Sequence, residues 1–162
     1  MNVPDPDHCL DDAPPAARAV ARGVCRLFFH LDLMSLCEVL LGNGRRADIV
    51  ALDARGRLTL VEIKVSLADL RGDRKWPEYL DYCDRYFWAV PAGFALDVLD
   101  EPWFQPERAG LIVADRYEAD MVRDAPFHAL PPARRKAETL RFARRAARRV
   151  LGSSDPLFAG TE

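Results

Sequence analysis

The sequence predicts an α/β fold in which helices flank a mixed β-sheet. Apolar residues first recur at the 3.6-residue period of a helix and then switch to the two-residue alternation of strands, after which helical and strand-like segments alternate. The chain has 162 residues, of which 49% are hydrophobic and 30% charged, as expected for one globular core. We therefore expect one domain over residues 14–151, with a loose N-terminal arm at 1–13 and a tail at 152–162.

The first helix is expected from Pro14 to about Asp32. Proline is favoured in the first turn of a helix, and the apolar residues that follow lie on one side with arginines on the other. Strand-like alternation then begins and is interrupted twice, by the turn-forming sequences GNG and DARG. The three strands that this pattern predicts are 36–41, 46–52 and 57–65.

The second half of the domain alternates in the same way. A second helix fits residues 67–85, interrupted or restarted at Pro77, and residues 86–90 form a short aromatic strand. A loop-rich stretch follows. The hairpin predicted after it consists of residues 111–114 and 119–122. A basic helix that begins at two consecutive prolines closes the domain.

The closing helix concentrates basic charge. Residues 131–151 hold eight basic side chains against one acidic, a net charge of +7, whereas residues 1–130 carry a net charge of −7. At about 100° per residue the arginines fall within one arc, and apolar residues such as Leu140 and Val150 lie opposite. We therefore expect the apolar side to dock on the domain and the arginine side to bind DNA phosphates by releasing counterions. The arginines assigned to DNA are Arg141, Arg145 and Arg148; a merely solvated face is the alternative.

The stretch RRADIVALDARGRLTLVEIKVS carries the candidate chemistry. A DARG turn centred on Arg55 places Asp48 directly opposite Glu62 across the strand pair. Lys64 lies two residues beyond Glu62 and shares its face. Like charges that face each other destabilise a sheet, and a divalent cation between them reverses that effect. The alternative is a solvent-facing strand with an ordinary Glu–Lys pair.

Two facing carboxylates suit a hard cation such as Mg²⁺ or Mn²⁺, which keeps several waters. We expect Asp48 and Glu62 to hold this cation together with the carbonyl oxygen of Ile63. Such a metal activates a water, and Lys64 would orient that water or neutralise charge that develops on a phosphate. The pattern therefore predicts phosphodiester hydrolysis, with Asp48, Glu62 and Lys64 as the catalytic residues.

The arrangement of these residues on a hairpin between two helices resembles the PD-(D/E)xK nuclease superfamily. The segments GRRADIVAL, VEIKVS, DRKWPEYLDYCDRYFWAV, GLIVAD and PPARRKAETLRFARRAA are similar to the MmcB-like family of bacterial DNA repair proteins, over about residues 16–150. The resemblance implies a restriction-endonuclease-like core and a metal-dependent nuclease role in DNA damage repair. It also implies that Asp48 and Glu62 are metal ligands and Lys64 the catalytic lysine. The first-helix glutamate of many members has no counterpart here, and Glu38 is the nearby candidate for an accessory acid.

Further DNA contacts are expected around this site. Lys75 and Tyr79 are four residues apart on the second predicted helix and so share a face, an arrangement similar to the Gln-xxx-Tyr helix of RecB-like nucleases. Lys75 would contact a phosphate, and Tyr79 would donate a hydrogen bond to it or stack on a base. Core packing of the aromatic residues is the alternative. Arg45 and Arg46 stand beside Asp48 and would touch DNA near the metal.

Location and partners follow from the remaining features. No apolar run approaches the ~20 residues of a membrane-spanning helix, and the N-terminus lacks a signal-peptide pattern, so we expect a cytoplasmic, nucleoid-associated protein without membrane contact. Repair-protein partners are expected, and a homodimer would let so small a nuclease cut both strands. The main alternative is a catalytically inactive DNA-binding or scaffold protein of the repair machinery. Another is a protein–protein adaptor that uses the aromatic residues around Trp103.

Overall fold

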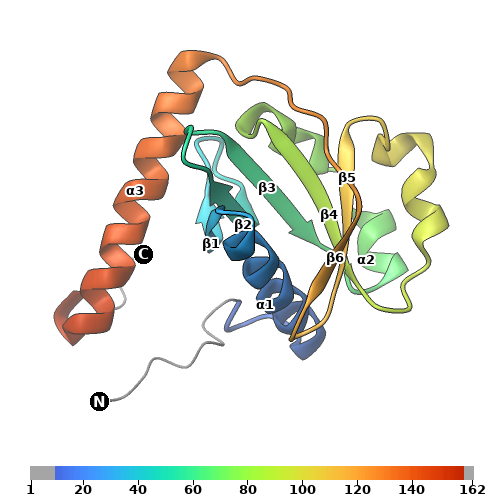
Figure 1. Cartoon of the computed structure of the whole chain (residues 1–162), viewed down its shortest axis with the longest axis horizontal. Helices are drawn as coiled ribbons and strands as arrows, with labels where there is room; N and C mark the ends of the chain where they lie inside the picture. The colour runs from blue at the N-terminus through green and yellow to red at the C-terminus, as the bar shows by residue number, and fades with distance from the viewer. Residues whose placement is uncertain (1–9, 159–162) are drawn as a thin grey trace.

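Six strands form one mixed sheet whose spatial order follows the chain, β1-β2-β3-β4-β5-β6 (Figure 1). The structure is a computed structural model and describes residues 10–158. Strands β1 to β3 are antiparallel to one another, β3 to β5 are parallel, and β6 is antiparallel to β5. The predicted α/β architecture, a mixed sheet flanked by helices, is therefore confirmed.

The strands lie where the sequence predicts them, with ends shifted by at most two residues. They are β1 (Met34–Leu40), β2 (Arg46–Leu52), β3 (Leu58–Ile63), β4 (Arg85–Pro91), β5 (Ala109–Ala114) and β6 (Ala119–Arg123). The α-helices are α1 (Pro15–His30), α2 (Leu67–Gly72) and α3 (Pro132–Ser154). Short 3₁₀ helices are η1 (Trp76–Tyr82), η2 (Leu96–Asp100), η3 (Pro102–Phe104) and η4 (Pro156–Phe158).

Helices and aromatic side chains cover the two faces of the sheet. Helix α1 lies across one face because its apolar side, with Val20 and Phe28 buried, packs against Phe87 of β4. Aromatic residues fill the opposite face, where the rings of Trp76 from η1 and Trp88 from β4 are 5.1 Å apart. Every residue of the central strand β3 is buried. Polar side chains of β3 are therefore enclosed by protein on either face.

The β2–β3 hairpin has the register that the DARG turn predicts. Ile49 pairs with Val61, and the ladder continues from there to the turn. Gly56 closes the turn in the left-handed region, with φ of +77°, where glycine has no steric penalty. One further step along this register places Asp48 opposite Glu62, as predicted.

The second helix predicted over 67–85, interrupted or restarted at Pro77, does consist of two segments: α2 ends at Gly72 and η1 begins at Trp76, with Asp73 between them. The Asp73 carboxylate accepts hydrogen bonds from the backbone N–H groups of Lys75 and Trp76, at 2.9 and 3.0 Å, and so starts a new segment. That segment is a 3₁₀ helix with about three residues per turn, in which residues four apart point in different directions. Lys75 is exposed and Tyr79 is buried, so the shared face predicted for them is wrong.

Helix α3 stands beside β1 (Figure 1) and docks through a different side from the one predicted. Its buried residues are Glu138 and Phe142. Leu140 and Val150, which were predicted to face the domain, are 59% and 67% exposed. The predicted docking of the apolar side is therefore wrong.

Polar groups at the edge of the domain explain this orientation. Arg135 donates hydrogen bonds to both carboxylate oxygens of the fully buried Asp84. Arg134 donates to a backbone carbonyl of η1 at 3.1 Å, and Arg149 donates to the carbonyl of Cys37 on β1. Guanidinium groups satisfy a buried carboxylate and strand-edge carbonyls, which leucine and valine side chains cannot do.

The predicted arm and tail are described in part. Leu10, near the end of the predicted arm, is 3% exposed and packs with the core beneath α1. Helix α3 continues past the predicted domain end at 151 to Ser154. Residues 1–9 and 159–162 lie outside the described residues. Within 10–158, no helix is both long and apolar enough to cross a membrane.

Candidate functional site

The two predicted metal ligands meet where β2 and β3 separate. Asp48 Oδ2 accepts a hydrogen bond from the N–H of Ile63 at 2.7 Å, and Glu62 Oε1 accepts one from the N–H of Asp48 at 3.2 Å. Each carboxylate takes a backbone donor of the opposite strand in place of a regular ladder bond. This reciprocal exchange holds the two carboxylates next to each other.

The carbonyl group of Ile63 faces the same place. In a β-strand the N–H and C=O of one residue point to the same edge. The N–H of Ile63 meets Asp48, whereas the N–H of Lys64 donates to the carbonyl of Ala89 on β4 at 2.9 Å. The Ile63 carbonyl therefore points toward Asp48, and the structure brings the three predicted ligand groups together.

Ionising both carboxyl groups is electrostatically costly. Burial raises the pKa of Asp48 from 3.8 to about 6, although the hydrogen bond from Ile63 and the charge of Lys64 oppose the rise. Burial, and then the negative charge of Asp48, raise the pKa of Glu62 well above its usual 4.5. Glu62 is only 5% exposed. A cation between the carboxylates would offset this cost.

The donor set fits a hard divalent cation. Asp48 Oδ1 and Glu62 Oε2 accept no protein hydrogen bond from the residues that the structure describes. Among those same residues, no three His, Cys, Asp or Glu side chains are grouped to hold a metal. A cation here would have two carboxylates, the Ile63 carbonyl and waters, which suits Mg²⁺ or Mn²⁺ better than Zn²⁺ with its preference for nitrogen and sulfur.

Lys64 is buried on the same face and is held by acids of the α2–η1 segment. Its Nζ lies 2.8 Å from Asp73 Oδ2 and 3.8 Å from Asp69 Oδ1. Burial favours the neutral amine, but the hydrogen bond and charge of Asp73 outweigh it and raise the pKa of Lys64. Lys64 is therefore a cation at neutral pH. With Lys64 7% exposed and Glu62 also buried, the alternative of a solvent-facing Glu–Lys pair is wrong.

Asp69 and Asp73 are the site residues that sequence reasoning missed. The Ser66 hydroxyl caps α2 by accepting the N–H of Asp69 at 3.1 Å, which places this acid in the first turn. Asp73 uses one carboxylate oxygen for Lys64 and the other to cap η1. The signal lay in SLADLRGDRKWP, where a capping serine precedes one acid and a second acid precedes Trp-Pro.

Arg45, Arg46 and Tyr79 lie at the start of β2, near the carboxylates. Tyr79 is 8% exposed, and its hydroxyl donates to the carbonyl of Arg46 at 3.1 Å. Burial, then the charges of Glu62 and Asp48, raise the pKa of that hydroxyl. Arg45 makes two hydrogen bonds to Glu78, at 2.8 and 3.0 Å. Arg46 is the more exposed of the two arginines, with a side chain 66% exposed against 31% for Arg45.

Glu38 occupies the same row on the neighbouring strand. The residue pairs on either side of it set Glu38 opposite Asp48 in the β1–β2 register. Its backbone is in the left-handed region, with φ of +53°, an uncommon conformation for a residue with a side chain. The Glu38 carboxylate lies 3.5 Å from Arg46. In backbone register the three acids thus form a row across β1, β2 and β3, and the side chain of the outermost, Glu38, pairs with Arg46.

The other predicted DNA contacts lie on either side of this row. Lys75 is exposed at the start of η1. On α3, Arg141 and Arg148 are exposed and Arg145 is half-buried. Because α3 runs beside β1, these arginines stand on the flank of the strand that carries Glu38.

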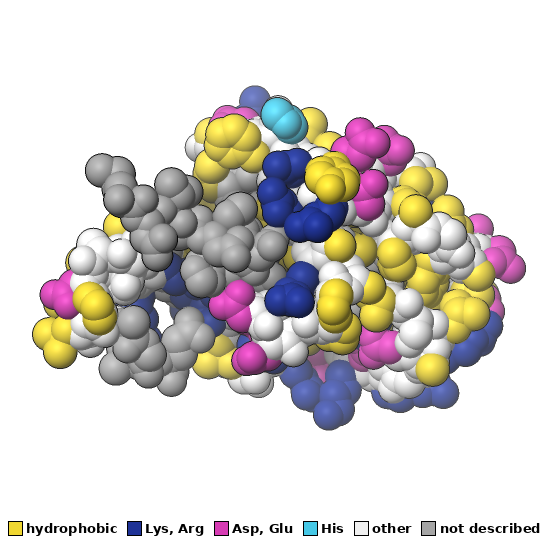
Figure 2. Space-filling model, turned by 90° about the horizontal axis from the view of Figure 1, so that it is seen from below, with side chains coloured by type: hydrophobic (Ala, Val, Ile, Leu, Met, Phe, Trp, Pro, Cys, Tyr) yellow, Lys and Arg dark blue, Asp and Glu magenta, His cyan; other side chains and the backbone are white. Residues whose placement is uncertain are grey.

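Basic charge is not confined to α3. A hollow of about 190 Å³ on the outer side of α1 is lined by Arg18, Arg22 and Arg116. Figure 2, which views the molecule from the end where α1 begins, shows Lys and Arg side chains gathered on this face. The sequence placed arginines on this outer side of the first helix, and the structure adds Arg116 from the β5–β6 turn.

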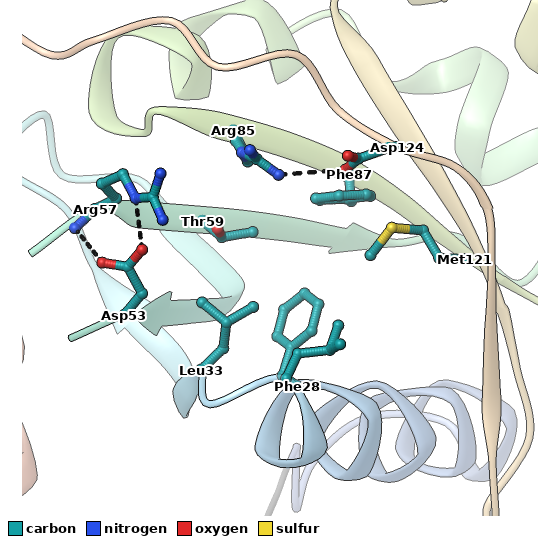
Figure 3. A pocket seen from close by; sticks show the side chains of 10 residues that line it. Phe28, Leu33, Asp53, Arg57, Thr59, Arg85, Phe87, Met121 and Asp124 are labelled. Atoms are coloured by element: carbon teal, nitrogen blue, oxygen red, sulfur yellow. Dashed lines mark hydrogen bonds and ion pairs between the residues drawn. The ribbon is translucent and has the colours of Figure 1, made fainter. Parts of the chain in front are cut away.

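A cavity of about 320 Å³ lies on the α1 face of the sheet (Figure 3). Its lining combines apolar side chains, one threonine and two ion pairs: Phe28, Leu31, Leu33, Phe87, Met121, Thr59, Asp53, Arg57, Arg85 and Asp124. The two arginines are paired with carboxylates at 2.6 and 3.4 Å, so the cavity presents no net charge. Thr59 and Glu62 are three residues apart on β3 and point to opposite faces. The cavity is therefore separate from the carboxylate pair.

Comparisons with known proteins place the chain in a family. The sequence matches the family described as DNA repair protein MmcB-like over residues 6–156. The solved structure of the SPO1766 protein of unknown function from Silicibacter pomeroyi is similar, with 39% identity, a TM-score of 0.82, and coverage of 94% of this chain and 99% of that chain. No curated protein gives a match. Because the family match spans nearly the whole chain, the protein belongs to the MmcB-like family of DNA repair proteins.

Proposed function

We propose that this protein is a Mg²⁺- or Mn²⁺-dependent DNA endonuclease of DNA repair, with a restriction-endonuclease-like core of the PD-(D/E)xK type. Membership of a DNA repair family suggests DNA as the partner. The observation that carries the proposal is the pair formed by the half-buried Asp48 and the buried Glu62, whose carboxylates meet at a strand junction and are held by backbone N–H donors. A divalent cation is the ligand that such a pair favours.

The chemistry follows from the groups around the pair. A bound hard cation supplies a more acidic water and stabilises charge on a phosphoryl oxygen. Asp48, Glu62 and the Ile63 carbonyl would hold it at the strand junction. Lys64 is kept charged by Asp73 and would donate a hydrogen bond to the attacking water or to the oxygen on which charge develops.

Substrate binding would use the basic side chains that reach solvent. Arg46 is beside the carboxylate row and can bind the phosphate next to the scissile bond. Arg141 and Arg148 on α3 would hold the DNA backbone further away without recognising its sequence. The row of acids and the flanking arginines together define one track for a phosphodiester backbone.

The test is cleavage of labelled single-stranded, flapped and branched DNA with Mn²⁺ or Mg²⁺. Lys64→Ala removes the ammonium group of the site and leaves both metal-binding carboxylates, so we expect it to abolish cutting. Lys136→Ala, an exposed lysine of α3, is the matched control and should cut like wild type. Activity that survives in Lys64→Ala would overturn the assignment of this lysine.

Metal binding is tested separately by titration calorimetry with Mn²⁺. Wild type should bind Mn²⁺, and Asp48→Asn should lose most of that affinity. If no substrate is cut, yet DNA binds with a steep salt dependence, the inactive DNA-binding or scaffold function replaces the nuclease. If the protein neither cuts DNA nor binds it in a salt-dependent way, the protein–protein adaptor function is favoured.

A further inference from the structure

The outward side of α3 forms an apolar seam. Leu140, Val150 and Leu151 are 59%, 67% and 49% exposed, and Ala143 and Ala147 are exposed between them. Spacings of three and four residues put these positions on one side of the helix over three turns. The seam is the side that the sequence predicted to be buried, so an apolar surface of helical length lies on the outside of the protein.

Helix η4 extends the seam. Leu157 and Phe158 are 78% and 42% exposed, and a hollow of about 260 Å³ separates Phe158 from the last turns of α3. The hollow is lined by two apolar seam residues, by Phe158 and by two arginines: Ala147, Leu151, Phe158, Arg144 and Arg148. Figure 2 shows hydrophobic side chains on the surface at the left, the side where α3 ends. A groove between two helical segments suits an inserted apolar side chain.

The helix is inverted relative to an ordinary surface helix. A surface helix buries its apolar side and exposes its charged side. Here the buried Glu138 and the arginines that bind Asp84 and Cys37 face the domain, and the leucines face water. Contiguous exposed apolar surface on a small protein marks an interaction site.

Charge selects the partner. Arg144 is exposed along one flank of the seam. Glu138, the single acid of residues 131–151, is buried and lies 3.6 Å from Arg141. A second copy of the chain would bring its own arginines to the same seam, and DNA has no apolar face to cover leucines. A helix with apolar residues on one side and Asp or Glu beside them would cover the apolar seam and pair its acids with the basic flank.

We propose that the outward face of α3 and η4 binds an acidic amphipathic helix of another protein. Its apolar residues would lie along Leu140, Ala147 and Val150, with one side chain in the hollow against Phe158. Its acids would meet Arg144. The surface is separate from the Asp48–Glu62 pair, and the proposal holds whether or not that pair cuts DNA.

The experiment uses the full chain and a fluorescein-labelled synthetic helical peptide of three heptads, with Leu at positions a and d and Glu at the flanking positions. Anisotropy should show binding of this peptide and much weaker binding of a second peptide with Lys in place of every Glu. Leu140→Gln combined with Val150→Gln should weaken binding by about tenfold or more, because apolar burial is lost. Val122→Gln, a residue of β6 that is 54% exposed, is the matched control and should leave binding unchanged.

Charge reversal supplies the second arm. Arg144→Glu should weaken binding of the acidic peptide and strengthen binding of the basic one, and circular dichroism checks that each variant keeps its fold. Absence of peptide binding, or equal binding of both peptides, overturns the proposal. A dimer in sedimentation velocity that Leu140→Gln dissociates would instead assign the seam to a second copy. Binding to anionic phosphatidylglycerol vesicles that the same variant abolishes would assign it to a membrane.

Discussion

Replacing Asp48 by Asn should stabilise the metal-free protein at neutral pH. The rise in the pKa of Asp48 from 3.8 to about 6 corresponds to about 3 kcal/mol of unfavourable free energy for the ionised carboxylate in the folded protein. The amide keeps an oxygen that accepts the N–H of Ile63, and it removes the repulsion that acts on Glu62. Since Asn forms a weaker hydrogen bond than a carboxylate, we expect a net gain of about 1–3 kcal/mol in the free energy of unfolding.

The stability gain from Asp48→Asn should increase as pH rises. The folded-state pKa is raised, so wild type has its full stability below about pH 4 and loses it as pH rises through about 6. The advantage of Asp48→Asn should therefore be largest at pH 7.5 and fall below about 1 kcal/mol at pH 4. Urea unfolding in EDTA at the two pH values measures it. Mn²⁺ should stabilise wild type and not the variant.

Asp53→Asn is the matched control because its carboxylate has the opposite shift. Although burial opposes it, hydrogen bonds from Arg57 lower the pKa of Asp53. This replacement should destabilise the protein at pH 7.5, and its effect should shrink in acid. If Asp48→Asn is less stable than wild type at pH 7.5, or if its advantage is the same at both pH values, the ionised Asp48 carboxylate does not destabilise the folded protein.

Three further changes probe other parts of the structure. Asp84→Ala leaves two buried backbone N–H groups and an arginine of α3 without their acceptor. Urea unfolding should therefore show a decrease of about 3–5 kcal/mol in the free energy of unfolding. The control is Asp124→Ala, whose ion pair is exposed and whose free energy of unfolding should decrease by less than about 1 kcal/mol. Asp73→Asn removes the charge that keeps the pKa of Lys64 raised, so the alkaline limb of the cleavage-rate profile should move to lower pH; an unchanged limb would contradict the role of Asp73. Arg141→Ala should reduce the slope of log affinity for DNA against log salt by about 1, and an unchanged slope would remove this arginine from the interface.

The hairpin that carries the candidate site was predictable because its determinants are local. Four residues, DARG, set the turn, and Gly56 takes up a conformation that few other residues adopt. Once the turn is set, the two-residue period of strands places Asp48 opposite Glu62 without further information. The depth of burial was not predictable, since it depends on Trp76 and Trp88 packing over the opposite face.

The misplaced features depend on contacts between distant segments. The period of α3 describes its two sides correctly, but the side that docks was decided by Asp84 and by the Cys37 carbonyl, which lie far away in the sequence. The second helix ends earlier than the interruption predicted at Pro77, because one side chain, Asp73, both caps η1 and pairs with Lys64. Such double roles leave little trace in a hydrophobic pattern.

The hydrogen bond from Arg149 to the Cys37 carbonyl has a consequence for assembly. β1 is a terminal strand of the sheet, and an uncovered terminal strand invites pairing with another chain and aggregation. Helix α3 occupies that rim and shields it from strand addition beside the acid row. The other terminal strand, β6, has five residues and an irregular register against β5, which makes it a poor template for sheet growth. The protein is thereby protected against fibre-like self-association at both ends of its sheet.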